Sequence, residues 1–244
     1  MKNIFKKMIY PIFFAMIGVA QICAVPLEGV SIHRAKAKLE VIHSKLRLVH
    51  GSLAEEYPEQ LMAAMYVQKN AKVLELGGNV GRNSCVIATI LKKSKNLVVV
   101  ESSTESARLL QENRDANGLQ FQIEASAISK VALVQNGWKT IPSDIDLPGY
   151  TRVNTINFKE LKKKYGIQFD TLVVDCEGAL YGILVDEPEM LKNINTIIIE
   201  NDFDDIAHME YVQNQFKQNG LKLSYNQAGG FGPCYDYFYQ VWKK

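Results

Sequence analysis

The sequence lacks a strong excess of charge of either sign. Its 244 residues include 28 Lys plus Arg and 26 Asp plus Glu, which leaves a net charge of +2. This small imbalance gives no basic surface that argues for nucleic acid, and we expect no nucleic acid partner. Internal repeats and low-complexity tracts are also absent. With 47% hydrophobic residues, the chain can instead bury one sizeable core.

Cysteine is scarce, and its spacing excludes two classes of small stabilised domain. Cys23 lies in an apolar segment, and Cys85, Cys176 and Cys234 are too far apart for a disulfide framework or a zinc knuckle. We therefore expect three buried thiols in the folded domain. The chain also has no N-x-S/T sequon, so glycosylation gives no evidence for a lumenal domain.

One long apolar run is present, close to the amino terminus. Three lysines lie within residues 1–7, and residues 8–25 are uncharged and mostly apolar. A run of about 17 to 25 apolar residues can cross a bilayer, so residues 1–30 are predicted to be a membrane anchor or a signal segment. Retention gives a membrane-associated protein and cleavage gives a secreted or lumenal one. The two alternatives stay open, because Ala24 fits a cleavage site only loosely.

Residues 31–70 form a predicted helical extension. Leu39, Ile42, Leu46 and Val49 recur at helical spacing within residues 31–49, with basic residues between them. The basic face either lies on anionic headgroups or is solvated while the apolar face packs on the domain edge, and we favour packing. A second helix is expected at residues 55–68.

Residues 71–244 alternate between strand and helix patterns, which predicts a mostly parallel sheet covered on both faces. The expected strands are residues 72–76, 97–101, 121–125, 169–175, 196–200, 221–225 and 237–242. Helices are expected at residues 84–92, 104–117, 159–165, 187–192 and 205–218. Residues 130–157 lack a helical period and are predicted to form a hairpin plus loop near the ligand edge.

A glycine-dense turn follows the first strand, in the segment VLELGGNVGRNS at residues 73–84. Gly77, Gly78 and Gly81 keep side chains out of this turn, and Asn83 and Ser84 are capping-type residues for the next helix. Ligands of such sheets bind outside the carboxyl ends of the strands. Acidic residues at or near these ends are Glu75, Glu101, Glu124, Asp175, Glu177 and Glu200.

These carboxylates favour one cofactor over another. A dinucleotide loop normally has glycine first in G-x-G-x-x-G, whereas Leu76 occupies that position here. S-adenosylmethionine carries a sulfonium cation and no phosphate, which suits an acidic edge. Glu101, about 20 residues after the turn, is placed to accept both ribose hydroxyl hydrogens. The predicted cofactor site comprises Glu75, Gly77, Gly78, Asn79, Gly81, Glu101, Ser102, Glu124, Ala125 and Asp175.

The chain also resembles a known family across residues 73–202. The matching segments are LELGGNVG, ESSTESARLLQENRDANG, EASAISK, NTINFKELKKKYGIQFDTLVVDCEGALYGIL and IIIEND. They resemble the motifs of FkbM-type methyltransferases, which use S-adenosylmethionine and mostly methylate hydroxyl oxygens. The resemblance implies a Rossmann-like class I methyltransferase fold, with a seven-stranded mostly parallel sheet and an antiparallel C-terminal strand. One departure is Leu180, which stands where the D-x-E-G-x-E pattern ends in an acid.

The predicted catalytic residues are Asp175, Glu177 and Glu200. Removing a proton from an acceptor hydroxyl requires a base, and we place Asp175 first and Glu177 second. If the strand end is extended, the two side chains share one face. No metal is assigned; the open alternative is that these hard ligands hold Mg²⁺. His208 is expected at the surface.

The expected partners are a hydroxyl-bearing acceptor, such as a glycan, and a membrane reached through the amino-terminal segment. The rival hypothesis is a non-catalytic protein that binds S-adenosylmethionine or a nucleotide and retains the fold.

Overall fold

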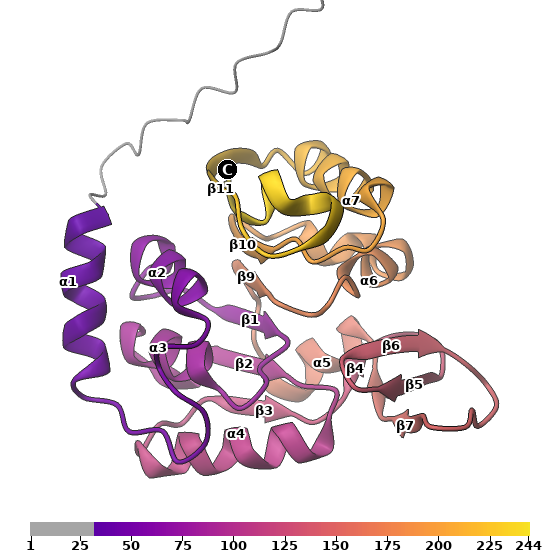
Figure 1. Cartoon of the computed structure of the whole chain (residues 1–244), viewed down its shortest axis with the longest axis horizontal. Helices are drawn as coiled ribbons and strands as arrows, with labels where there is room; N and C mark the ends of the chain where they lie inside the picture. The colour runs from indigo at the N-terminus through magenta and orange to yellow at the C-terminus, as the bar shows by residue number, and fades with distance from the viewer. Residues whose placement is uncertain (1–31) are drawn as a thin grey trace, which may run out of the picture.

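The computed structural model describes residues 32–244, so the predicted anchor or signal segment lies outside the described residues. A seven-stranded sheet forms the centre of the molecule, in the order β11-β12-β10-β9-β1-β2-β3 (Figure 1). Six strands run in the same direction, and β12 runs antiparallel to its two neighbours, β10 and β11. The strands are β1 (Val73–Leu76), β2 (Leu97–Val100), β3 (Gln122–Glu124), β9 (Thr171–Val174), β10 (Thr196–Glu200), β11 (Lys222–Gln227) and β12 (Tyr239–Lys243).

The strands alternate side chains between two apolar layers. Val73 and Val173 point to one face of the sheet, and their neighbours Leu74 and Leu172 point to the other. Helices α1 (Ile32–His43), α2 (Tyr57–Tyr66), α3 (Arg82–Ile90) and α4 (Thr104–Ala116) contribute to the first layer. Helices α5 (Phe158–Tyr165), α6 (Leu180–Asp186) and α7 (Ile206–Gln218) contribute to the second. Burial on both faces explains why the parallel strands read as continuous apolar runs.

The amino-terminal helices belong to the first layer. Ala35, Leu39 and Ile42 of α1 are buried in the same apolar cluster as α2 and α3. The structure therefore shows packing by the apolar face of this helix, as the sequence favoured. None of the helices within residues 32–244 is long and apolar enough to cross a bilayer.

Strand order reverses between β1 and β9, which are paired side by side. Two crossover directions meet there, so the loops after these strands diverge and leave a crevice. The predicted ligand edge is the carboxyl end of these strands.

Three segments differ from the sequence predictions. Helix α1 ends at His43, so Leu46 and Val49, which were expected on its apolar face, lie beyond it. The expected helix at residues 187–192 is only a 3₁₀ turn, η2 (Pro188–Leu191), and α6, which precedes it, was not predicted. Pro188 removes a backbone donor, and Gly182 weakens the helical pattern of α6.

Residues 130–157 contain more strand than the predicted hairpin plus loop. The hairpin is β5 (Leu133–Asn136) with β6 (Lys139–Pro142), and β7 (Thr151–Val153) adds a third antiparallel strand. A parallel pair, β4 (Ala127–Ile128) with β8 (Thr155–Ile156), joins this small sheet to the main domain. The remaining short 3₁₀ turns are η1 (Ser94–Asn96) and η3 (Gly232–Tyr237).

Candidate active site

The turn after β1 is packed tightly between neighbouring elements. Gly77 has φ 83°, and a Cβ atom there would lie 1.5 Å from the carbonyl oxygen of Asp175. A Cβ atom at Gly81, which has φ 91°, would lie 2.2 Å from Leu110 Cδ1 of α4. Only glycine lets this turn fit between the end of β9 and α4.

The predicted cap of the next helix is wrong. Helix α3 begins at Arg82, with Gly81 at the N-cap and no side-chain cap. Asn83 is turned inward, and its Nδ2 donates to Glu75 Oε1 at 3.2 Å. The left-handed backbone of Gly81 already ends the turn, so Asn83 lies within the helix rather than before it.

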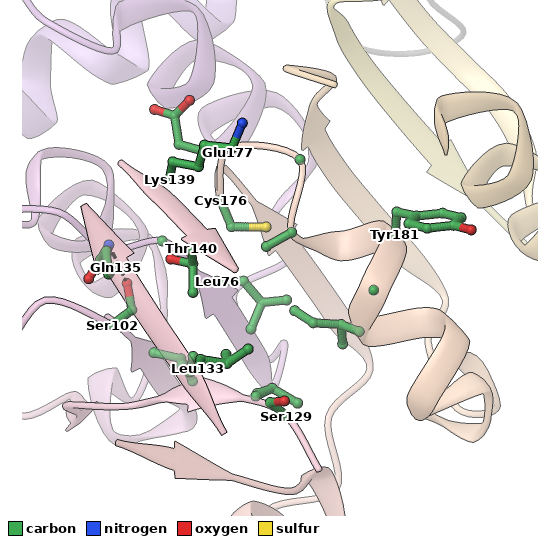
Figure 2. Close-up of a pocket in the computed structure, with 18 of the residues that line it drawn as sticks. Leu76, Ser102, Ser129, Leu133, Gln135, Lys139, Thr140, Cys176, Glu177 and Tyr181 are labelled. Atoms are coloured by element: carbon green, nitrogen blue, oxygen red, sulfur yellow. Dashed lines mark hydrogen bonds between the residues drawn. The ribbon is translucent and has the colours of Figure 1, made fainter. Parts of the chain in front are cut away.

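A cavity of about 800 Å³ opens at the carboxyl ends of β1, β2 and β9. Its size is in the range of cofactor sites. Figure 2 shows Leu76 and Cys176 on its sheet side, with Leu133, Gln135, Lys139 and Thr140 of the β5–β6 hairpin beside them. Tyr181 of α6 lines the far side. The hairpin is therefore a wall of the cavity rather than a distant appendage.

Glu101 is fixed at the floor of this cavity. Its Oε2 accepts from the backbone N–H of Asn79 at 2.7 Å, and its Oε1 accepts from Ser103 N–H at 2.8 Å. Ser102 lies beside it and accepts a hydrogen bond from Gln135 Nε2 through its Oγ, at 3.0 Å. Burial raises the pKa of Glu101, and the backbone donors oppose this shift. Each carboxylate oxygen keeps a second lone pair for a ligand hydroxyl.

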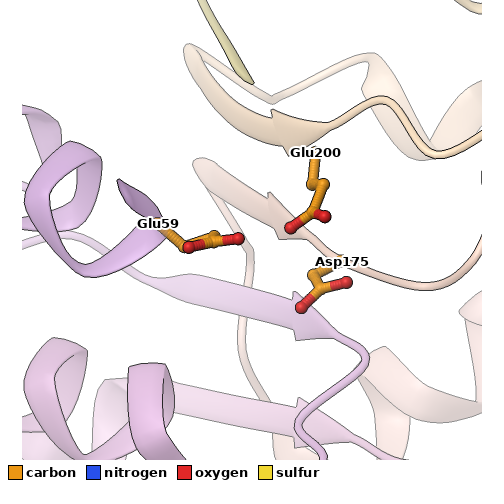
Figure 3. Close-up of side chains that lie close together, drawn as sticks. All are labelled: Glu59, Asp175 and Glu200. Carbon is orange, nitrogen blue, oxygen red and sulfur yellow. The ribbon is translucent and has the colours of Figure 1, made fainter. Parts of the chain in front are cut away.

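A second set of carboxylates lies under α2. Glu75, Asp175 and Glu200 point to the α2 face, because they alternate with residues of the opposite layer. Glu59 of α2 meets two of them: one carboxylate oxygen from each of Glu59, Asp175 and Glu200 lies within 4.8 Å of the others. Figure 3 shows the three side chains close together, with Glu59 extending from α2 toward Asp175 and Glu200. Glu59 was not among the predicted site residues, because its position depends on how α2 docks on the sheet.

Burial raises the pKa values of Asp175 and Glu200. The pKa of Asp175 rises well above its usual range through burial and the nearby charges of Glu56 and Asp202. The pKa of Glu200 rises to about 11 through burial and the neighbouring carboxyl groups of Glu59 and Asp175. A cation close to Asp175 and Glu200 favours their ionised forms.

Asp175 and Glu177 do not share an extended strand end. Strand β9 ends at Val174, and Glu177 has φ 52°, in the left-handed region. Glu177 is exposed and lines both the large cavity and a second cavity of about 370 Å³. The second cavity is also lined by Glu200, Asp202, Phe231 and Phe238. Glu177 therefore lies on the boundary between the two cavities.

Neither a family model nor a curated protein matches this chain. Among solved structures, the chain is similar to a ribosomal protein L11 methylase from Lactobacillus delbrueckii subsp. bulgaricus. The TM-score is 0.51 at 13% identity, and the match covers 81% of each chain. The chain has the Rossmann-like fold of methyltransferases. At this identity, the likeness shows the fold alone.

Two further matches are cofactor-bound structures. An O-methyltransferase from Bacillus cereus in complex with SAH has a TM-score of 0.48 at 15% identity, over 89% of this chain and 94% of that chain. Cofactor-bound Rv0187 from MTB has a TM-score of 0.46 at 14% identity, over 89% and 92%.

Within the methyltransferase fold, the predicted site residues fall into two groups. Those that line the large cavity are Gly77, Asn79, Glu101, Ser102, Asp175 and Glu177. Those outside its lining are Glu75, Gly78, Gly81, Glu124, Ala125 and Glu200. Glu124 is held outside this lining, because its Oε2 accepts from Lys164 Nζ at 2.7 Å and from the Tyr165 hydroxyl at 2.9 Å. Ser126 and Ala127 line the cavity instead.

Two residues contradict their predicted surroundings. His208 is half-buried and stacks on Tyr181, with ring centroids 3.8 Å apart, and both line the cavity. It was expected at the surface. The sequence could not show its burial, because the docking of α6 against α7 has no local sequence pattern. Cys176 also lines the cavity and is not fully buried, whereas Cys85 and Cys234 are buried as predicted.

Proposed function

We propose that this chain is an S-adenosylmethionine-dependent methyltransferase that acts on a hydroxyl oxygen. The observation that carries the proposal is the large cavity at the strand-order reversal, with Glu101 held at its floor and Asp175 at its edge. In such a site the carboxylate of Glu101 accepts the ribose hydroxyls, and the acidic edge attracts the sulfonium. A dinucleotide cofactor is disfavoured, because its G-x-G-x-x-G turn is incomplete here. Leu76 occupies the first glycine position and lines the cavity.

The resemblance of the sequence motifs to FkbM-type methyltransferases supports the direction of transfer to oxygen. That family mostly methylates hydroxyl groups, and the motifs that resemble it supply Glu101, Asp175 and Glu177 of the site. The acceptor proposed is a hydroxyl on a glycan or another small molecule. Association with a membrane through residues 8–25 is proposed from the sequence alone.

The two cavities give the donor and the acceptor separate places. In-line transfer requires the acceptor oxygen to lie on the axis of the sulfur–methyl bond. We place the cofactor in the large cavity and the acceptor in the smaller one, so that the methyl group passes at Glu177. Glu177 and Asp204 are accessible carboxylates that line both cavities. We assign Glu177, which belongs to the family-like motif, as the group that receives the acceptor proton. Asp175 lies among other carboxyl groups and orients the acceptor.

One observation favours a protein that binds the cofactor without catalysis. Leu180, which stands in place of the third acid of the family pattern, is 1% exposed and belongs to the core. No carboxylate can replace it without burying a charge. If that acid is essential in the family, this chain has lost it.

A transfer assay separates the two functions. The full chain is incubated with methyl-labelled S-adenosylmethionine and a panel of glycans, and products are identified by mass spectrometry. We expect label on a hydroxyl oxygen, its loss in Glu177→Gln and Asp175→Asn, and cofactor affinity retained in both. The control is Glu210→Gln, an exposed residue of α7. Unchanged turnover in both site variants rejects the assignment of these carboxylates.

A further inference from the structure

Three carboxylates from separate elements converge beside the proposed transfer site. Glu59 comes from α2, Asp175 follows β9 and Glu200 ends β10. One oxygen from each lies within 4.8 Å of the others, and Figure 3 shows the three carboxylates close together. Pairing of β9 with β10 in register at Val174 and Ile199 places Asp175 and Glu200 side by side. The third ligand arrives from the helix that covers this edge.

The cluster has no cationic partner within residues 32–244. No Lys, Arg or His of this part of the chain forms an ion pair with any of the three carboxylates. Arg82 is engaged by Glu55 and Glu56. Carboxylates placed this close repel one another unless protons or a cation neutralise them.

Glu59 supplies a second observation. Its side chain is only 6% exposed, and its Oε2 is buried without a hydrogen-bond partner among the described residues. An unpartnered carboxylate oxygen costs free energy in a protein interior. Figure 3 shows the Glu59 side chain extending from α2 toward Asp175 and Glu200. A buried carboxylate oxygen that has no hydrogen-bond partner and lies near two other carboxylates can coordinate a metal ion.

We propose that Glu59, Asp175 and Glu200 hold one hard divalent cation, of the Mg²⁺ or Mn²⁺ class. Carboxylate oxygens are the preferred ligands of such ions. Ligands about 2.1 Å from an octahedral ion are separated by up to roughly 4.2 Å, which the cluster reaches with a small side-chain adjustment. Water and an acceptor oxygen complete the coordination.

The role of this cation rests on the proposed function. Asp175 lines the large cavity and Glu200 lines the smaller one, so an ion between them faces both cavities. There it binds the acceptor hydroxyl, holds its oxygen toward the methyl group and lowers the pKa of the hydroxyl. Glu177, which is not one of the three ligands, remains available to take the proton.

The test measures binding of Mn²⁺ alone to the full chain. After chelator treatment and dialysis, Mn²⁺ is titrated and free ion is followed by electron paramagnetic resonance. We expect one Mn²⁺ per chain, displaced by excess Mg²⁺. Glu59→Gln, Asp175→Asn and Glu200→Gln should each weaken binding by about tenfold or more, because each removes a charged ligand. Glu210→Gln should bind like the wild type, and circular dichroism checks that each variant is folded.

Two results overturn the proposal: no Mn²⁺ bound at millimolar concentration, or equal affinity in the wild type and Glu59→Gln. The first result means that the carboxyl groups share protons instead. Binding of S-adenosylhomocysteine is measured separately on the same samples. Mn²⁺ binding without cofactor binding rejects the proposed function and leaves the cation site standing, whereas the reverse rejects only the cation site.

Discussion

At the scale of single residues, the site depends on where each side chain of a strand points. Glu75 and Leu76 are neighbours in β1, yet Glu75 is buried beneath α3 and Leu76 lines the cavity. The alternation of strand side chains decides this, and it is visible in the sequence. The sequence prediction did not separate the two faces of each strand and so placed Glu75 against the cofactor.

Glu75 makes the stability of the domain depend on pH. Burial raises its pKa from the ordinary 4.5 to about 8, with Glu56 and Glu101 adding to the rise and Asn83 opposing it. Because the folded state holds this proton more tightly, its contribution is complete below pH 4.5 and is lost as pH rises through 8. We expect wild type to lose stability relative to Glu75→Gln by about 1.4 kcal/mol per pH unit within this window. Urea unfolding at pH 5, 6, 7 and 8 measures the difference; a constant difference contradicts the assignment.

Gly77 tests the packing of the turn. Its positive φ and the short approach to Asp175 mean that Gly77→Ala must displace the end of β9. A strained backbone conformation typically costs about 1–3 kcal/mol. We expect Gly77→Ala to lower the free energy of unfolding by more than this and to abolish cofactor binding. Gly118→Ala is the matched control, because Gly118 has φ 62° and open space around its Cβ position. Equal losses in both variants show that backbone strain, rather than the contact with Asp175, is responsible.

At the scale of elements, most strands and helices of residues 32–244 were predictable, and α6 was not. Buried apolar runs with sharp ends, such as Leu97–Val100, identify parallel strands without other information. Helix α6 was missed because its seven residues include Gly182 and have no side-chain cap. The convergence of Glu59 on Asp175 and Glu200 was also out of reach, since it depends on the docking of α2.

Helix α1 is predicted to unfold together with the domain. Leu39 is fully buried against the first layer, whereas Val41 on the same helix is 55% exposed. We expect Leu39→Ala to lower the unfolding free energy by about 2–5 kcal/mol. Val41→Ala should change it by about 0.5 kcal/mol or less. Urea unfolding followed by circular dichroism distinguishes the two; equal, small effects mean that α1 is not part of the cooperative unit.

At the scale of the whole molecule, one sheet carries two cavities on one edge. The parallel strands bring Glu101 and Asp175 to the same edge, and the hairpin and α6 wall the larger cavity. The mostly parallel sheet, its two helical layers and this edge followed from the sequence pattern. The division into a donor cavity and a smaller acidic cavity did not, because residues 226–238 reach this edge only through the antiparallel return of β12.

The central claim is that the large cavity binds S-adenosylmethionine, and titration calorimetry on the full chain tests it most directly. We predict one molecule bound per chain. Glu101→Gln should weaken binding by about tenfold to a hundredfold, because it removes a charged acceptor of hydrogen bonds. Absence of binding to a folded chain, or the same affinity in Glu101→Gln, contradicts the account.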